Sequence, residues 1–299
     1  MFTEINKTLN QIHPDVVHTH LHSGYYCFYA YRRLKYPFKK IHTLHNLAKE
    51  DAPLHGRKLF KYFFKRNIIH PVAISEEVFK SAVDEYGPCV KTLINNGSDE
   101  IKPSPAFDET ITKINAFKKN HDTKIFLNIA RISRQKNQQL LFDCMRMLDQ
   151  QQTNVVTLIL GDYVPENKKI FDELMANKPA NVHFLGKVTN VADYLLCADA
   201  FALTSLYEGL PISLLEALSA GVIPVCTPVG GIKNIVTKEI GFLSDDISTV
   251  GYLNAIQAYL QCEPQRLAQM KANGKELYQK EFSMQSCAAK YNELYHDNE

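Results

Sequence analysis

The sequence predicts an α/β protein with two domains, each built around a parallel sheet. Short runs of β-branched residues alternate with helical patterns along the chain, which is typical of parallel βα units. A polar, proline-containing stretch, NNGSDEIKPSPAFDET, divides the chain into halves and is typical of an interdomain linker. A length of 299 residues suits two domains, and a hydrophobic content of 45% allows sizeable cores.

The first half begins with a helix and has room for about four strands, fewer than a full nucleotide-binding fold uses. At ~30 residues per βα unit, roughly two units could be missing from its front. Its predicted strands are Val16–His20, Ile41–Leu44, Val72–Ile74 and Thr92–Ile94.

The second half is expected to form a nearly complete Rossmann-like domain. Its predicted strands are Ile125–Ile129, Val155–Leu160, Val182–Leu185, Ala200–Leu203 and Val222–Val225. Helices are predicted between them at Asn137–Gln150, Glu166–Asn177, Val191–Cys197 and Pro211–Ala220.

Composition narrows the class of protein. A formal net charge of +2 is too small to indicate a nucleic-acid partner by itself. Seven scattered cysteines, never in a CxxC pair, are typical of reduced thiols in a cytoplasm. No stretch approaches the ~20 apolar residues of a membrane span, and the polar N-terminus lacks the apolar core of a signal peptide. We therefore expect a cytoplasmic protein, either free or peripheral on the cytoplasmic face of a membrane.

The stretch YEGLPISLLEALSAG, residues 207–221, is the most informative one. Pro211 suits the first turn of a helix and Gly221 suits the residue past its end, so the helix starts at the carboxyl end of a predicted strand. Ligands of open α/β sheets bind there, and a helix N-terminus favours negative charge. Glu208 and Glu216 could both face that crevice. Alternatively, Glu208 is a dipole partner and Glu216 a surface residue.

A basic loop, ARISRQKN, follows the strand Ile125–Ile129. Cations are disfavoured at a helix N-terminus, so Arg131, Arg134 and Lys136 indicate an anion between them. Arg131 and Lys136 could clamp a diphosphate, although a solvated basic turn is the simpler alternative. Glycines also follow apolar strands in LILGDY and PVGGIKNIV, but each of these patterns alone is weak evidence.

In this order the segments resemble the C-terminal domain of the retaining GT-B glycosyltransferases of family 4. The resemblance rests on the basic loop, FLGKV, ADAFALTSLYEGLPISLLEALSAGVIPV, GGIKNIV, GFLSDD and FSMQSCAAKYNELY. In the first half, PDVVHTH, IHTLHN, AISEEV and INNGSD also resemble family landmarks. The glutamates separated by seven residues are the specific part of this pattern.

The resemblance implies the GT-B fold, in which two Rossmann-like domains face each other across a cleft, here with an incomplete N-terminal domain. Residues 1–105 would form the acceptor-side domain and residues 106–280 the nucleotide-sugar-binding domain. Residues 281–299 would form a C-terminal helix that packs back toward the first domain. Tyr163 departs from the family pattern, since many relatives have a second glycine there.

The resemblance also implies a role for each site residue. Arg131 and Lys136 match the diphosphate-binding pair, and Glu216 matches the glutamate that binds the ribose hydroxyls. Glu208, with the backbone of Gly209 and Leu210, matches the group that holds the donor sugar. His45 matches the active-site histidine of the N-terminal domain, and the base would lie against the backbone of Lys187 and Val188.

Histidines are concentrated in the first half, where eight of the eleven fall within the first 70 residues. His18, His20 and His22 alternate along a strand, so a zinc site is conceivable, but a polar strand end lining the cleft is the favoured interpretation. The chain contains no Asp-x-Asp. We therefore expect no metal and no cofactor, with Arg131 and Lys136 binding the diphosphate instead.

Residues 31–70 combine eleven Lys and Arg residues with interleaved aromatic residues and only two acidic ones. A helix such as RKLFKYFFKRNII suits an anionic membrane surface. An amphipathic core helix with a solvated basic face is an equal alternative, and no recognised motif supports a nucleic-acid partner.

We expect a metal-independent retaining glycosyltransferase of the hexosyltransferase type. It would move a sugar from a nucleotide diphosphate sugar, with a UDP-sugar favoured, to a glycan or lipid-linked acceptor in cell-surface polysaccharide synthesis. Two mechanisms of retention remain open. In the first, the leaving phosphate oxygen takes the proton of the acceptor hydroxyl on the same face of the sugar. In the second, an enzyme carboxylate forms a covalent intermediate with the sugar in a double displacement. The rival is a non-catalytic protein that binds nucleotide sugars or glycans. A sugar-nucleotide epimerase would need a different set of carboxylates. A dinucleotide-dependent oxidoreductase is a poor fit, because no GxGxxG motif follows any predicted strand of this chain.

Overall fold

The computed structural model describes residues 2–297, and the side chains of all of these except residues 2 and 29. Its contacts group into two compact units, one of Met1–Asn96 with Cys287–Glu299 and the other of Gly97–Ser286. Residues 97–105 group with the second unit because the linker is hydrogen-bonded to it. The Ile101 N–H donates to Ser219 Oγ at 2.9 Å, and the Ser104 N–H donates to Asp193 Oδ1 at 2.7 Å.

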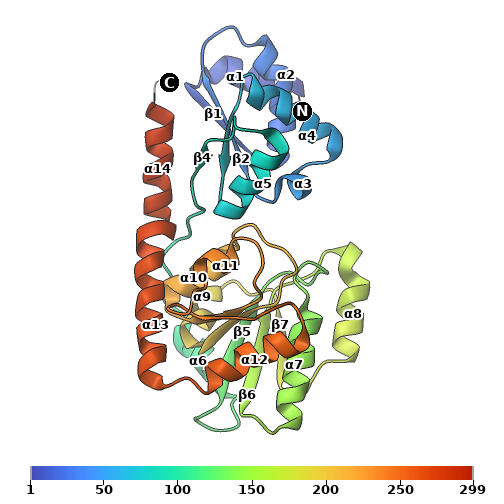
Figure 1. Ribbon diagram of the computed structural model, residues 1–299, viewed down its shortest axis with the longest axis vertical. Helices are drawn as coiled ribbons and strands as arrows, with labels where there is room; N and C mark the ends of the chain where they lie inside the picture. Colours follow the sequence, from blue (N-terminus) through green and yellow to red (C-terminus); the bar gives the residue numbers. More distant parts are fainter. Residues whose placement is uncertain (1, 298–299) are drawn as a thin grey trace. The chain divides into compact units, whose positions relative to one another are not determined.

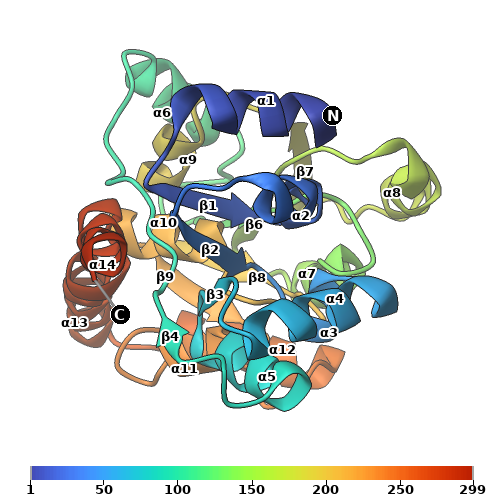
Figure 2. The same cartoon turned by 90° about the horizontal axis from the view of Figure 1, so that it is seen from above.

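The first unit contains a four-stranded parallel sheet in the order β1-β2-β3-β4 (Figures 1 and 2). Its strands are β1 (Val16–His20), β2 (Lys39–Leu44), β3 (His70–Ala73) and β4 (Thr92–Leu93). Its helices are α1 (Phe2–Ile12), α2 (Ser23–Arg33), α3 (Ala48–Asp51), α4 (Leu54–Lys65), α5 (Glu76–Tyr86) and, from residue 287 on, α14 (Met284–His296). The four strands predicted from the sequence are confirmed, each within two residues at either end.

Helix α4 is amphipathic: three of its aromatic side chains lie in the core, and its opposite face is exposed. Phe60, Phe63 and Phe64 are buried. Phe63 stacks on Phe28 with ring centroids 4.5 Å apart, and Phe60 stacks on His42 at 4.4 Å. These rings supply much of the apolar area that holds α2 and α4 in place.

The second unit contains a six-stranded parallel sheet in the order β10-β9-β8-β5-β6-β7. Its strands are β5 (Lys124–Ile129), β6 (Val155–Leu160), β7 (Val182–Gly186), β8 (Ala200–Leu203), β9 (Ile223–Cys226) and β10 (Phe242–Leu243). Its helices are α6 (Phe107–Asn115), α7 (Gln138–Gln150), α8 (Lys168–Ala176), α9 (Val191–Cys197), α10 (Ile212–Ala220), α11 (Ile232–Ile235), α12 (Thr249–Leu260) and α13 (Pro264–Leu277), with short 3₁₀ and π segments at Pro165–Asn167 and Tyr278–Phe282. The five predicted strands are confirmed, and β10 was not predicted.

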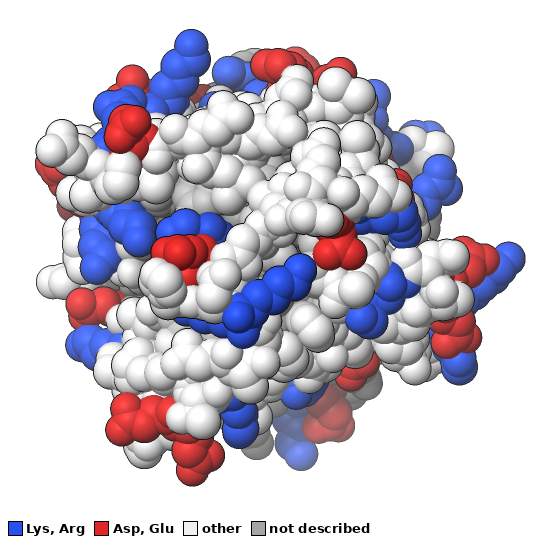
Figure 3. Space-filling model, turned by 90° about the horizontal axis from the view of Figure 1, so that it is seen from below, with Lys and Arg blue, Asp and Glu red and all other residues white. Residues whose placement is uncertain are grey.

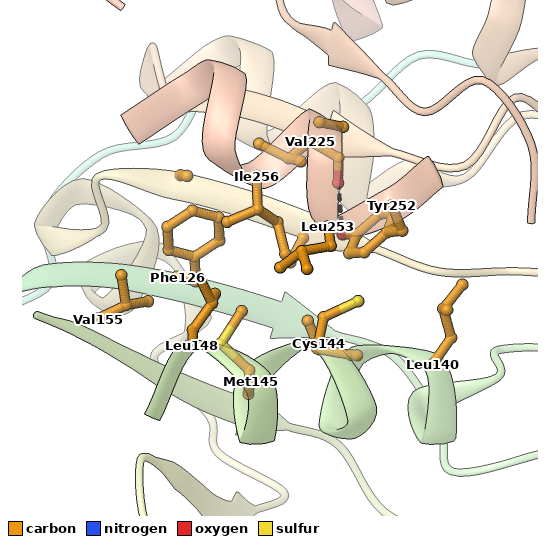
Figure 4. Close-up of a cluster of buried hydrophobic side chains, with 14 of the residues drawn as sticks. Phe126, Leu140, Cys144, Met145, Leu148, Val155, Val225, Tyr252, Leu253 and Ile256 are labelled. Atoms are coloured by element: carbon orange, nitrogen blue, oxygen red, sulfur yellow. Dashed lines mark hydrogen bonds between the residues drawn. The ribbon is translucent and has the colours of Figure 1, made fainter. Parts of the chain in front are cut away.

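The core of the second unit lies between its sheet and helices α7 and α12 (Figure 4). Phe126 of β5 packs with Met145 and Leu148 of α7 and with Ile256 of α12. The buried Tyr252 hydroxyl donates to the Val225 carbonyl at 2.8 Å, so its polar end is satisfied. A continuous apolar core of this kind fixes the carboxyl ends of the strands, where the loops of the candidate site begin.

Among residues 2–297, no helix combines the length and the apolar character needed to cross a bilayer. On the face drawn in Figure 3, Lys and Arg side chains are interspersed with Asp and Glu and with wide uncharged areas.

Candidate functional site

The candidate site lies at the carboxyl edge of the second sheet, at its topological switch point. From β5 the chain continues to β6 and β7 on one side, and it then returns to β8 on the other side of β5. The loops after β5 and β8 therefore leave the sheet in opposite directions, which is the arrangement that opens a ligand crevice in doubly wound sheets. The basic loop follows β5, and the segment around Glu208 follows β8.

Lys136 and Glu208 form a largely buried ion pair at this edge. Lys136 Nζ lies 2.5 Å from Glu208 Oε1, and their side chains are 17% and 7% exposed. The Ser205 hydroxyl donates to the same carboxylate oxygen at 2.6 Å. The other oxygen, Oε2, has no hydrogen-bond partner within residues 2–297. The pair thus combines a fixed cation with a free acceptor atom.

Three further hydrogen bonds join the basic loop to the segment that follows β8. Thr204 Oγ1 donates to the Lys136 carbonyl at 3.0 Å, and the Leu206 N–H donates to the Gln135 carbonyl at 2.8 Å. Gln135 Nε2 donates to the Tyr207 carbonyl at 3.0 Å. Sequence reasoning missed Gln135, Thr204 and Ser205. The signal that could have indicated the last two is a pair of small hydroxyl residues directly after an apolar strand.

The PVGG turn supports the Glu208 segment from the other side. Gly230 has φ +50°, and an added Cβ there would overlap the carbonyl oxygen of Glu208. The Gly231 N–H donates to the Gly209 carbonyl at 2.9 Å, and Thr227 Oγ1 donates to the Ser205 carbonyl at 2.7 Å. Glycine is therefore required at residue 230 for two reasons: its positive φ, and the close approach of its backbone to the Glu208 carbonyl.

Arg131, Lys187 and Val188 line a mostly apolar hollow of about 210 Å³ at the ends of β5, β6 and β7. Gly161 permits this hollow, because a Cβ at that residue would overlap the carbonyl of Ala130. The Gly161 N–H donates to the Gly186 carbonyl at 2.9 Å and ties β6 to β7. An apolar hollow beside an exposed guanidinium suits a flat ring attached to an anionic group.

Glu216 lies on α10, which ends at Ala220 as predicted and begins at Ile212, one residue after the predicted start, with Pro211 at the N-cap. Gly221 ends the helix with φ +72°, as expected for a residue past a helix C-terminus. Glu216 is half-buried, and burial raises the pKa of its carboxyl group. No hydrogen bond or ion pair joins Glu216 to Arg131, Lys136 or Glu208 within residues 2–297. The structure therefore brings Lys136 and Glu208 into direct contact, and within residues 2–297 it joins neither Arg131 nor Glu216 to them.

His45 lies in the first unit at the carboxyl end of β2, next to other histidines. Its Nε2 atom lies 3.0 Å from His20 Nδ1. His18 contacts Tyr295 Oη through Nδ1 at 2.8 Å and Thr43 Oγ1 through Nε2 at 2.7 Å. Because both ring nitrogens of His18 are occupied, the zinc interpretation of His18, His20 and His22 loses support. No cluster of three or more potential metal ligands is present among the described residues.

Asp51 positions the loop that carries His45, and sequence reasoning missed it. Its Oδ1 atom accepts the backbone N–H groups of His45 and Asn46, each at 3.1 Å. Burial raises the pKa of Asp51 to about 6. Burial and the neighbouring His20 lower the pKa of His45 to about 4, so the ring is neutral at pH 7.

Acidification from pH 7 to 4.5 is expected to destabilise the first unit. Burial lowers the pKa of His42 to about 3, so between pH 6.5 and 3 the unfolded state binds a proton that the folded state does not. His18 and His45 act in the same direction, with pKa values lowered to about 4. Asp51 acts in the opposite direction between about pH 6 and 4, because its folded pKa is raised.

We expect His42 alone to cost roughly 2–3 kcal/mol of unfolding free energy at pH 4.5. Urea unfolding followed by circular dichroism at both pH values measures this loss. The His42→Phe variant keeps an aromatic ring against Phe60 and should lose less stability than the native chain. An equal loss in both proteins would contradict the assignment to His42.

Comparison with known proteins adds three findings. Residues 109–277 match the family model described as glycosyl transferases group 1. An uncharacterized glycosyltransferase of Methanocaldococcus jannaschii is 27% identical over 263 residues, covering 82% of this chain and 63% of the relative. The UDP-Gal:alpha-D-GlcNAc-diphosphoundecaprenol alpha-1,3-galactosyltransferase of Escherichia coli is 25% identical over 264 residues, covering 84% of this chain and 67% of that enzyme.

Among solved structures, the HepE protein of Anabaena in complex with UDP and glucose gives a TM-score of 0.85 at 18% identity. The match covers 98% of this chain and 80% of that one. At this identity the likeness shows the fold alone. It confirms the predicted α/β fold class, with parallel sheets as in the GT-B glycosyltransferases.

Proposed function

This chain belongs to the glycosyl transferases group 1 family, and from that premise we propose that it is a retaining glycosyltransferase of family 4. It moves a sugar from a nucleotide diphosphate sugar to a glycan or lipid-linked acceptor. A UDP-sugar is favoured, because the Escherichia coli relative is named for a UDP-galactose donor and solved neighbours hold UDP. A role in cell-surface polysaccharide synthesis is supported by a Bacillus subtilis relative named for teichuronic acid biosynthesis.

The observation that carries the proposal is the Lys136–Glu208 pair at the switch point, whose lysine shares the loop after β5 with the exposed Arg131. A buried cation held at a fixed position can neutralise the diphosphate as its bond to the sugar breaks, without the cost of reorganising water. Arg131 adds a planar fork that suits phosphate oxygens. These side chains supply the positive charge, so the proposed transferase is metal-independent.

The remaining residues bind the other parts of the donor. Glu208 Oε2 accepts hydrogen bonds from sugar hydroxyls, with help from the backbone of Gly209 and Leu210. The base occupies the apolar hollow beside Lys187 and Val188. Glu216 binds the ribose hydroxyls, and its raised pKa reflects a half-buried carboxyl group without a protein partner among the described residues.

Retention is proposed to occur on one face of the sugar. The leaving phosphate oxygen takes the proton of the acceptor hydroxyl as that hydroxyl attacks the anomeric carbon. A covalent intermediate on Glu208 is less favoured, because its carboxylate already binds Lys136 and Ser205. His45, neutral at pH 7, is proposed to hydrogen-bond the donor sugar and the acceptor.

The proposal is tested by incubating the chain with a panel of radiolabelled nucleotide sugars and candidate acceptors. Transfer with the donor's anomeric configuration, determined by NMR of the product, is the expected result. A product of inverted configuration would contradict retention. Because the chain spans 63% of the length of one relative, a non-catalytic binding protein is the second candidate. Donor binding without transfer or donor hydrolysis would favour it.

The membrane partner is proposed to be an anionic surface that contacts the outer face of α4. Leu54, Leu59 and Tyr62 are exposed there, among basic residues such as Lys58 and Lys65. Exposed apolar residues among basic ones are typical of helices that lie on anionic bilayers.

We therefore expect the chain to sediment with vesicles that contain an anionic lipid and to be released at about 0.5 M salt, where charges are screened. Leu59→Asp should weaken this binding, whereas Lys80→Met on α5 should not. Equal binding to neutral vesicles would contradict the electrostatic part of the proposal, and unchanged binding of Leu59→Asp would contradict the role of α4.

A further inference from the structure

A separate cavity lies in the first unit at the amino edge of its sheet. Its volume is about 420 Å³, within the range of roughly 300–1,000 Å³ that small-ligand pockets have. Six of the residues that line it are Phe38, Lys39, Lys40, Ile69, His70 and Lys91. The proposed transfer reaction gives this cavity no role.

Parallel pairing brings these residues together. Strand β2 begins at Lys39, β3 begins at His70, and Lys91 immediately precedes β4. The register places Ile41 opposite His70 and Val72 opposite Thr92, so the starts of the three strands converge at one edge. Lys40 and His45 are five residues apart, so the cavity and the histidine-bearing edge are about 16 Å apart along β2. The cavity is therefore distinct from the candidate active-site edge.

The cavity is strongly basic. Three lysines and one histidine line it, and among the residues that the structure describes no aspartate or glutamate does. Within residues 2–297, none of the three lysines forms an ion pair with a carboxylate. Lys39 Nζ donates to the Leu294 carbonyl at 2.5 Å and to the Asp297 carbonyl at 2.7 Å. Lys40 Nζ donates to the Phe38 carbonyl at 3.2 Å. Lys91 is exposed at the rim.

The positive charges around this cavity repel one another. Lys40 Nζ lies 4.0 Å from the centre of the Phe38 ring, which compensates part of its positive charge. Burial lowers the pKa of Lys40. The pKa of His70 is lowered by burial and by the charges of Lys39 and Lys91, whereas the Asp297 carboxylate raises it. An anion with two negative charges would relieve this repulsion more than a carboxylate would.

We propose that this cavity is a binding site for a phosphate group, formed by Lys39, Lys40 and Lys91 at the amino edge of the first sheet. The phosphate can belong to a soluble phosphate ester or to the headgroup of a lipid, since both present the same dianionic oxygens. Lys40 and Lys91 supply free N–H donors, and His70 lies beside them with its Nε2 atom already engaged by Thr92 Oγ1 at 2.6 Å.

The test measures the affinity for inorganic phosphate by calorimetry, with UDP in excess to fill the donor site. The titrations are repeated in an Arg131→Ala background, so that weak phosphate binding at the donor site is recognised. Lys40→Met and Lys91→Met each keep an apolar stem, and we expect each to weaken phosphate binding about tenfold. The matched control is Lys80→Met, which removes an exposed lysine outside the cavity and should bind like the native chain.

A second arm distinguishes the two sources of the phosphate. Vesicles of phosphatidylcholine with and without phosphatidic acid are sedimented with the same variants. If the site takes a lipid headgroup, Lys91→Met releases the chain from phosphatidic acid vesicles more than Lys80→Met does, and free phosphate competes. If the site takes a soluble ester, only the calorimetric difference appears.

The proposal is overturned if Lys40→Met and Lys91→Met match Lys80→Met in both arms. Lys91 is exposed at the rim, so its substitution leaves the fold intact even if Lys40→Met proves unstable. Circular dichroism and the unfolding midpoint of each variant establish that binding is compared between folded proteins.

Discussion

Replacing Lys136 with alanine is expected to lower turnover by about 100-fold or more, as the loss of a preorganised electrostatic group commonly does. The lysine ammonium is held by Glu208 Oε1 at a fixed place beside the proposed diphosphate. Its contribution is greatest where negative charge develops on the leaving group, so kcat should fall more than KM rises. Steady-state kinetics with the best donor found in the nucleotide-sugar panel measure both constants.

Controls separate this effect from misfolding. Removing Lys136 leaves the Glu208 carboxylate buried without its cation, which could destabilise the fold by about 3–5 kcal/mol. The double variant Lys136→Ala, Glu208→Gln removes that uncompensated charge and should fold, yet it should stay as inactive as the single variant. Lys168→Ala, which removes an exposed lysine of the same unit, should leave turnover unchanged. Near-normal turnover of folded Lys136→Ala would exclude Lys136 from the mechanism.

Replacing Gly230 with alanine is expected to abolish most activity and to lower the unfolding free energy by roughly 2–4 kcal/mol. The added Cβ would overlap the Glu208 carbonyl, and the residue has a positive φ that favours glycine. The backbone of the Glu208 segment must therefore shift, and it carries the carboxylate that holds Lys136. Urea unfolding and the transfer assay together measure the two losses.

Gly87→Ala is the matched control for backbone conformation. Gly87 also has a positive φ, but the nearest atom to an added Cβ is Lys65 Cε at 3.9 Å, so only strain is introduced. This variant should lose some stability and keep its activity. If Gly230→Ala were as active as Gly87→Ala, the packing of the PVGG turn against Glu208 would not matter for function.

Regular elements could be predicted closely where the pattern of apolar residues was long enough. Strand β6 and helix α9 have the predicted bounds, because a fully buried run rich in β-branched residues and a clear helical periodicity leave little freedom there. Strand β10 was missed because two residues, Phe242 and Leu243, carry no periodicity. It forms by pairing with β9, which is a tertiary effect that no local pattern contains.

The candidate site could be predicted only in part. The residue types at the ends of β5 and β8 indicated an anion site, and the structure brings Lys136 and Glu208 together although 72 residues separate them. That contact follows from β5 and β8 being neighbours in the sheet, which sequence spacing does not give. Asp51 was missed for the same kind of reason, since its bonds to backbone N–H groups depend on how the chain turns after β2.

The most direct test of the central claim is a calorimetric titration of the chain with UDP and with UMP. We expect UDP to bind at least about tenfold more tightly, because charge-assisted hydrogen bonds from Arg131 and Lys136 hold the second phosphate. The Arg131→Ala variant should lose most of that difference. If neither nucleotide bound, or if both bound equally well and Arg131→Ala changed nothing, the second unit would not hold a nucleotide diphosphate as proposed.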